Sequence, residues 1–254
     1  MYSVNLQKNN RMYSIYRKEL SSYFSSLIAY ITLGVFLLVL GLFVWVFNDT
    51  SILNYNYAGL DQLFTITPLV FTFLIPAITM RSFAEERQNG TIELLKTKPI
   101  SDIQIILAKF FASFTLVLLA LLPTLIYFYS VYQMGSPKGN LDIGGTLGSY
   151  IALLFLVAAF VSIGLFSSSI TTNQIVAFVM GTFLCFFVYW AFYFISRLPM
   201  FVGRLDDIIE RLGIAFHFEA LSRGVLDSRN LIYFISLIVF FIASTLTVLK
   251  INKK

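Results

Sequence analysis

His217 and Glu219 are the two residues of this sequence that come closest to a catalytic or metal-binding pair. An imidazole and a carboxylate held together can act as general acid and base, or as two ligands of a metal ion. One histidine and one glutamate make a poor metal site, however, and Cys185, the one cysteine, stands alone inside an apolar run. The sequence therefore predicts no metal site and no catalytic residue, and an intramembrane enzyme is the least favoured function.

The charged stretch 81–102 is the second place where side chains could do specific work. It carries both signs of charge, on Glu85, Glu86, Arg87, Glu93, Lys96 and Lys98. It contains two capping-box patterns, Ser82 with Glu85 and Ser101 with Gln104. Gly90 divides the stretch, so we predict a pair of short helices whose mixed charge suits docking against another protein. The alternative is a solvated loop whose basic residues only set membrane topology.

The rest of the chain has the composition of an integral membrane protein. Of its 254 residues 58% are hydrophobic and 12% are charged, against roughly 25% charged in an average soluble domain. The long uncharged runs are 20–48, 62–80, 110–137, 143–196 and 230–249. A spanning helix needs about 20 residues, so the run 143–196 holds two spans, separated by the polar cluster 167–174.

We therefore predict an all-α membrane protein with a single transmembrane domain over residues 1–254. The six predicted spans are about 27–47, 62–80, 108–132, 146–167, 174–196 and 230–250.

Basic residues indicate the orientation of these spans. They gather in the N-terminal segment 8–18, the connection 81–109 and the tail 250–254. Six spans put these three regions on one side of the membrane, and the positive-inside rule places that side in the cytoplasm. The segment 197–229 also holds arginines, but it is zwitterionic and long, so we expect it outside. Membrane topology thus explains the net charge of +5, and no soluble basic face remains for nucleic acid.

Two segments outside the spans have the pattern of amphipathic helices. In residues 1–26 and just beyond, apolar side chains recur at helical spacing: Met12, Tyr16, Leu20, Tyr23, Phe24 and Leu27. We predict a cytoplasmic helix lying along the membrane surface; the alternative is an extension of the first span. Residues 204–229 carry an apolar stripe at helical spacing, formed by Leu205, Ile208, Ile209, Leu212 and Phe216. This stripe predicts short helices that dip into the outer leaflet before the last span.

The spans lack the groups that would power transport by themselves. No carboxylate, histidine or arginine lies in the middle of any predicted span, although pumps driven by protons or ions depend on such groups at depth. The chain also contains no G-x-x-x-x-G-K-[ST] phosphate loop. If the protein moves a substrate, the energy must come from another polypeptide.

The order of these elements resembles that of an ABC-2 type transporter permease. The stretch 80–101 is similar to the coupling-helix region of that family. Three further stretches resemble the gliding-motility-associated permease subunit of Bacteroidetes: 121–125, 173–178 and 217–227.

This resemblance implies a permease subunit of the bacterial inner membrane with both termini in the cytoplasm, functioning in export linked to gliding motility. It implies a separate cytoplasmic ABC ATPase, which would hold ATP and magnesium, and a second membrane subunit or a copy of this chain. A subunit with an extracytoplasmic domain would complete the complex in the lipid bilayer. By position, the contacts to the ATPase would be Glu85, Glu86, Arg87, Gly90, Thr91 and Glu93.

Two other functions share these sequence features. One is a scaffold that uses the ATPase for envelope assembly or mechanical work without moving a compound. The other is the related permease that serves metallocentre maturation, although the spans lack the Cys, Met or His clusters that direct copper handling would need.

Overall fold

The computed structural model describes residues 2–54, 57–91, 100–201, 203, 205–224 and 227–251, with side chains from Met12 onward except that of Ile28. The described residues are mainly helical and contain no strand. Six helices are long and apolar enough to span a membrane, which confirms the predicted all-α, six-span architecture. These candidate spans are Ala29–Val46, Asp61–Gln88, Asp102–Met134, Ile143–Ile170, Gln174–Ser196 and Ser228–Ile251.

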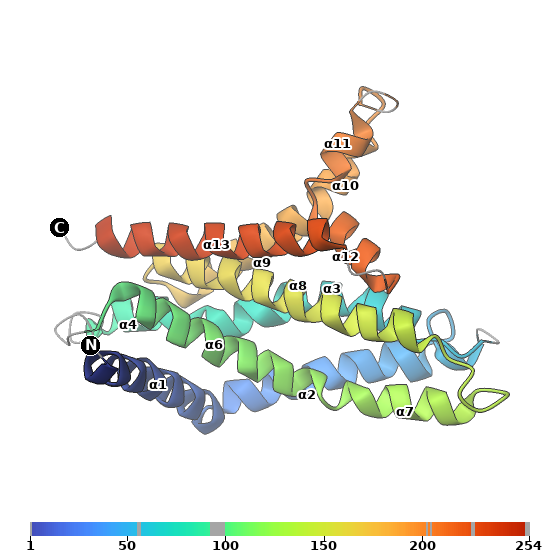
Figure 1. Ribbon diagram of the computed structural model, residues 1–254, viewed down its shortest axis with the longest axis horizontal. Coiled ribbons are helices and arrows are strands. Elements are labelled where there is room, and N and C mark those ends of the chain that lie inside the picture. The colour runs from blue at the N-terminus through green and yellow to red at the C-terminus, as the bar shows by residue number, and fades with distance from the viewer. Residues whose placement is uncertain are drawn as a thin grey trace.

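The helices follow one another with short connections (Figure 1). The first half contains α1 (Tyr2–Ser25), α2 (Leu27–Gly41), η1 (Leu42–Val46), η2 (Ile52–Asn54), α3 (Asp61–Thr79), α4 (Arg81–Gln88), α6 (Asp102–Leu121) and α7 (Thr124–Met134). The second half contains α8 (Ile143–Ile170), α9 (Gln174–Phe186), η3 (Phe187–Ala191), α10 (Phe192–Ser196), α11 (Asp206–Glu210), α12 (Ile214–Ser222) and α13 (Ser228–Ile251).

Three spans form the centre of the bundle and three lie at its edge. In the most apolar stretch of the second, third and fourth spans, which contain α3, α6 and α8, 61%, 61% and 72% of the residues are buried. The corresponding shares in the first, fifth and sixth spans are 22%, 22% and 17%. The helix α8 is apolar all round and packs against α3, α6, α9, α12 and α13, as expected for a core helix. Its approach to α3 is close because Gly164 faces Thr79, whose Oγ1 would collide with any Cβ at position 164.

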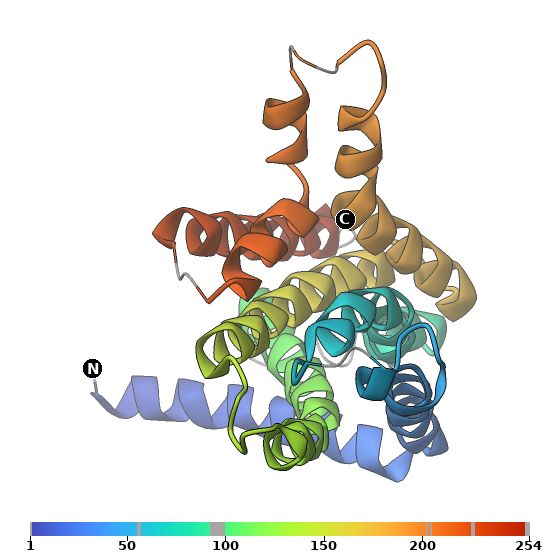
Figure 2. The same cartoon turned by 90° about the vertical axis from the view of Figure 1, so that its right-hand side faces the viewer.

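The two ends of the bundle differ in what they carry. At one end lie α4 and the last residue of α13; we call this the proximal end (Figure 1, left). At the other, the distal end, α7 finishes and α3 and α8 begin. The helix α1 packs against α6 at the proximal end, and Figure 2 shows it running across the bundle, whose spans are seen nearly end-on.

The contact face of α1 differs from the predicted stripe. Ile15 and Tyr23 are buried, and Met12 and Tyr16 pack partly against the core. Phe24 and Leu27, which the pattern placed on the same stripe, are exposed. Leu27 leaves the stripe because α1 ends at Ser25 and Leu27 begins a new helix with another direction, whereas Phe24 lies on the face of α1 that does not contact the core.

The segment before the last span projects sideways from the bundle. The π-helical turn η3 follows α9, and the chain then leaves through α10 and returns through α11 and α12 (Figures 1 and 2). The extra residue of a π turn changes the direction of a helix. Large apolar side chains are exposed on this projecting segment: Leu198, Met200, Leu205, Ile208 and Leu212.

Candidate functional site

The helix α4 continues the second span beyond a single break at Met80. The helix α3 ends at Thr79 and α4 begins at Arg81, so Ser82 lies inside the first turn of α4. The predicted capping box of Ser82 with Glu85 is therefore wrong. Glu85 instead accepts a hydrogen bond from Arg81 Nε at 2.9 Å, one helical turn away.

A side chain from another span supplies polar partners at this break. Ser168 Oγ, on α8, accepts hydrogen bonds from the backbone N–H groups of Phe83 at 3.0 Å and Ala84 at 3.1 Å. The same hydroxyl donates to the carbonyl of Met80 at 2.8 Å. Backbone groups at a helix terminus need such partners when water cannot reach them. Ser168 thus fixes α4 to the core of the bundle.

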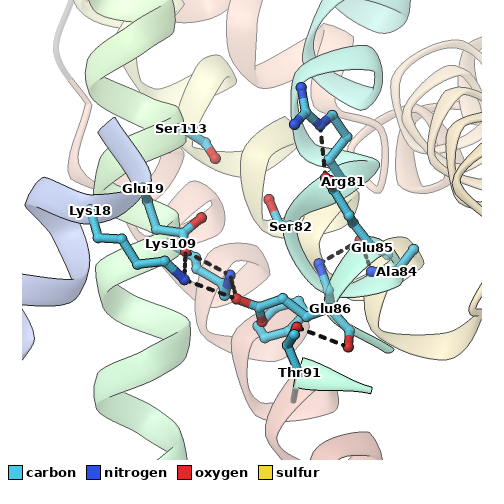
Figure 3. Close-up of polar contacts among 12 residues, drawn as sticks. Lys18, Glu19, Arg81, Ser82, Ala84, Glu85, Glu86, Thr91, Lys109 and Ser113 are labelled. Carbon is cyan, nitrogen blue, oxygen red and sulfur yellow. Dashed lines mark hydrogen bonds and ion pairs between the residues drawn. The ribbon is translucent and has the colours of Figure 1, made fainter. Parts of the chain in front are cut away.

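A buried cluster of charges joins α4 to α1 and α6 (Figure 3). Lys109 of α6 is 1% exposed, and its Nζ lies 2.9 Å from Glu86 Oε1 of α4 and 3.0 Å from Glu19 Oε1 of α1. Lys18, at the exposed rim, lies 3.8 Å from both carboxylates. A buried ammonium is tolerated only with close, well-placed carboxylates. The Lys109 cluster, as we call Glu19, Glu86 and Lys109, therefore requires these three helices to be together.

Neutral hydrogen bonds support the same junction. The hydroxyl of Tyr23 on α1 lies 2.9 Å from Ser113 Oγ on α6 and 3.2 Å from Ser82 Oγ on α4. Burial raises the pKa of Tyr23, so the phenol keeps its proton and can donate. Arg81 adds a link to the start of the first span, because its Nη1 donates to Ser26 Oγ at 2.8 Å.

The site still has unused hydrogen-bonding capacity. Within the described residues, Glu86 Oε2 and Arg87 Nη2 are buried without a hydrogen-bond partner. A polar cavity of about 190 Å³ is lined by Glu86 together with Lys18, Glu19, Arg81 and Glu85. Groups of this kind can accept a complementary side chain from another protein.

One comparison decides the family. The profile of the ABC-2 family transporter proteins matches residues 40–249. The chain belongs to the ABC-2 transporter family. It is thus a membrane permease subunit of an ABC transporter, a multi-pass membrane protein that is not itself a catalyst. No curated protein matches this sequence.

The residues expected to contact the ATPase of this ABC-2 permease lie in different environments. Glu85 is 37% exposed, whereas Glu86 is 14% exposed and turned toward Lys109. Gly90 has a φ of 68°, the left-handed conformation that glycine adopts most readily, and turns the chain after α4. Thr91 Oγ1 donates to the Glu86 carbonyl at 3.3 Å.

The second half of the predicted helix pair is less fully described. Glu93, Lys96 and Lys98 lie outside the described residues. The capping box at its far end is confirmed, because the N–H of Ser101 donates to Gln104 Oε1 at 3.1 Å at the start of α6.

Sequence reasoning missed three residues that build the site: Glu19, Lys109 and Ser168. Lys109 had a detectable signal, because it stands between Ala108 and Phe110 at the edge of a spanning run, where an ionisable group needs a partner. Nothing in the sequence pairs it with Glu19, which is 90 residues away. Ser168 lies in the polar cluster 167–174, which the sequence predicts only as the connection between two spans.

At the distal end, His217 and Glu219 do not form a pair. His217 Nε2 lies 2.9 Å from the Arg211 carbonyl and Nδ1 lies 2.7 Å from Asn230 Oδ1, while the ring stacks on Tyr233 at 3.9 Å. Residues two apart on a helix project from nearly opposite sides, and Glu219 faces a separate cavity. In the part of the chain that the structure describes, no group of three His, Cys, Asp or Glu side chains could hold a metal ion.

Proposed function

We propose that this permease is driven by a separate cytoplasmic ABC ATPase that docks on the proximal end, at α4 and the turn at Gly90. The observation that carries the proposal is the Lys109 cluster. It ties the docking segment to α1 and α6 through two carboxylates at 2.9 and 3.0 Å. A displacement of α4 cannot leave these helices behind without separating buried charges.

The contacts around α4 give a route for that displacement. Ser168 links α4 to α8, Tyr23 links it to α1 and α6, and α3 follows directly from Met80. The three most buried spans are therefore joined to one short helix. ATP and magnesium would be held by the ATPase, and its dimerisation on ATP would move α4 and these spans together.

The proposed contacts divide into two kinds. Glu85, Arg87, Gly90, Thr91 and Glu93 would meet the ATPase. Glu86 would act as a positioning residue, because one of its oxygens is committed to Lys109 while the other has no partner among the described residues. A basic or polar side chain of the ATPase could complete that second oxygen.

We further propose that the complex is an exporter of the bacterial inner membrane, with both termini cytoplasmic, and that it functions in gliding motility. The basic segments at the proximal end support the orientation. The stretches 121–125, 173–178 and 217–227 support the motility link by their resemblance. A second membrane subunit or a copy of this chain, and a subunit with an extracytoplasmic domain, would complete the assembly.

Affinity purification of the full chain from gently solubilised membranes tests the docking site. We expect a stoichiometric ABC ATPase with the wild type and its loss with Gly90→Pro, because proline cannot adopt a φ of 68°. Glu86→Lys should have the same effect by placing a second ammonium beside Lys109. The matched control is Asp207→Asn, which removes a surface ion pair with Arg211 at the far end.

Two results would contradict the proposal. One is a wild-type complex without an ATPase, and the other is undiminished recruitment by both Gly90→Pro and Glu86→Lys. ATP hydrolysis by a complete complex that moves no compound would instead favour the scaffold function over export.

A further inference from the structure

A second cavity, lined by both polar and apolar side chains, lies at the distal end, away from the Lys109 cluster. It has a volume of about 360 Å³ and is bounded by the start of α3, by α8, by η3 and by α12. A neighbouring cavity of about 310 Å³ shares five lining residues with it, Asp61, Phe64, Ser149, Ser222 and Arg223. The two cavities form one recess, which plays no part in the proposed docking of the ATPase.

The recess presents both signs of charge. Glu219 and Arg223 of the α12 segment are exposed in it, and Asp61 lies across from them at the start of α3. Within the described residues neither Glu219 nor Arg223 forms an ion pair, whereas Asp61 accepts a hydrogen bond from the Tyr57 hydroxyl at 3.1 Å. Asp142, whose Oδ1 accepts a hydrogen bond from the Gly145 N–H at the start of α8, also lines the smaller cavity. Three carboxylates and one guanidinium suit a ligand that carries a cation as well as an anion.

Aromatic side chains line the part of the recess that would bind the cation. Trp190 and Tyr189 line it, with ring centroids 4.3 Å apart. Aromatic faces attract ammonium groups, and tryptophan does so most strongly. Tyr193 also lines the recess, but the guanidinium of Arg197 lies 5.1 Å from its ring. Among the described residues, no cationic side chain lies over the ring of Trp190.

Apolar side chains continue from the recess toward the middle of the bundle. On α3, Leu69 follows the lining residue Thr65 by four residues and is 45% exposed. On α9, Phe186 precedes Trp190 by four residues, is 43% exposed and lies 5.1 Å from its ring. Steps of four residues place each pair on one helix face, about 6 Å apart along the axis. A hydrocarbon chain can lie along these faces.

We propose that this recess binds a zwitterionic phospholipid of the phosphoethanolamine type. The lipid phosphate binds Arg223, the ammonium group lies among Glu219, Asp61 and Trp190, and an acyl chain runs over Leu69 and Phe186. An anionic lipid without an ammonium group is disfavoured, because it would leave the carboxylates facing its phosphate. This inference concerns the distal end alone and does not depend on docking of an ATPase.

Native mass spectrometry of the full chain, released from nanodiscs with equal phosphatidylethanolamine and phosphatidylglycerol, tests the proposal. We expect the wild type to retain phosphatidylethanolamine preferentially. Arg223→Gln and Glu219→Gln should each lower that retention on the order of tenfold, the value of one charged hydrogen bond. The matched control is Arg211→Gln, a change of the same type on the projecting segment, which should retain lipid like the wild type. All these sites are exposed, so each variant should fold, as gel filtration would verify.

Three outcomes would overturn the proposal. Equal retention of phosphatidylglycerol would show a lipid shell without head-group selection, and wild-type retention by both recess variants would place the lipid elsewhere. Displacement by millimolar glycerophosphoethanolamine would show that a soluble zwitterion is the ligand. Because the recess variants leave α4 unchanged, ATPase recruitment measured on the same samples separates this test from that of the proposed function.

Discussion

The proximal end of the bundle is joined by buried ion pairs, whereas the distal end is joined by the hydrogen bonds of His217 and by stacked rings. At the proximal end, Lys109 is 1% exposed and lies within 3.0 Å of two carboxylates from other helices. At the distal end, His217 of α12 contacts Asn230 of α13 and the Arg211 carbonyl at the end of α11, and its ring stacks on Tyr233 of α13.

This difference indicates how each end responds to force. Breaking a buried ion pair leaves a charge without solvent or partner, so the helices of the proximal end should move as one body. Replacing one neutral hydrogen bond with another costs less, because each is worth only about 1 kcal/mol net. We therefore expect the distal end to rearrange while the proximal end transmits the movement.

The largest effect should come from Lys109→Met, which removes the cation and keeps an unbranched apolar chain. Glu19 and Glu86 would then keep only Lys18, 3.8 Å away at the exposed rim, as a cationic neighbour, at a cost of about 3 kcal/mol. We expect a lower thermal midpoint in detergent, measured by gel filtration after heating, and loss of ATPase recruitment.

A triple variant sharpens this prediction. Glu19→Gln and Glu86→Gln combined with Lys109→Met remove all the buried charge, so most of the lost stability should return. ATPase recruitment should stay low if the charges specify the geometry of α4. If the single Lys109→Met variant were as stable as the wild type, buried charge would not be what holds the proximal end together, and the proposed difference between the two ends would be wrong.

A smaller effect is expected for Ser168→Ala. It leaves the N–H groups of Phe83 and Ala84 and the carbonyl of Met80 without their side-chain partner, at a cost of about 2–3 kcal/mol. Ser169→Ala is the matched control, because Ser169 Oγ donates to the Phe166 carbonyl within its own helix. Equal thermal midpoints for the two variants would show that Ser168 does not fix α4.

The spans were predictable because charge is so costly in hydrocarbon that uncharged runs reveal them directly. Local motifs were predictable when all their members lay within one turn, as with Ser101 and Gln104. The same reasoning failed at Ser82, where the pattern of a helix start was present but the chain was already helical. A capping box read from sequence cannot show whether a span ends before it.

The site itself was only partly predictable. The sequence located the segment Arg81–Gln88, but it gave no means of telling Glu85, which is 37% exposed, from Glu86, which is 14% exposed and paired with Lys109. That separation depends on α1 and α6, whose contributions come from positions 19 and 109. Contacts between such distant positions depend on how helices pack, and helical periodicity within each segment does not contain that information.

The smallest of the three effects should come from His217→Phe at the distal end. Phenylalanine keeps the stacking on Tyr233 but leaves the Arg211 carbonyl and Asn230 without a partner, at a cost of about 1–2 kcal/mol. Because no charge is left behind, the bundle should stay folded and still recruit the ATPase. The change should appear instead as faster limited proteolysis between residues 197 and 213, on the order of tenfold, since local opening would cost that much less.

Phe216→Leu provides the control for His217→Phe, because Phe216 is a neighbour that keeps both hydrogen bonds of His217 intact. It should leave the proteolysis rate near that of the wild type. If His217→Phe instead abolished ATPase recruitment, the distal end would be coupled to α4 as tightly as the Lys109 cluster is. The two ends would then move as one body, because the hydrogen bonds of His217 at the distal end would determine the geometry of the Lys109 cluster at the proximal end.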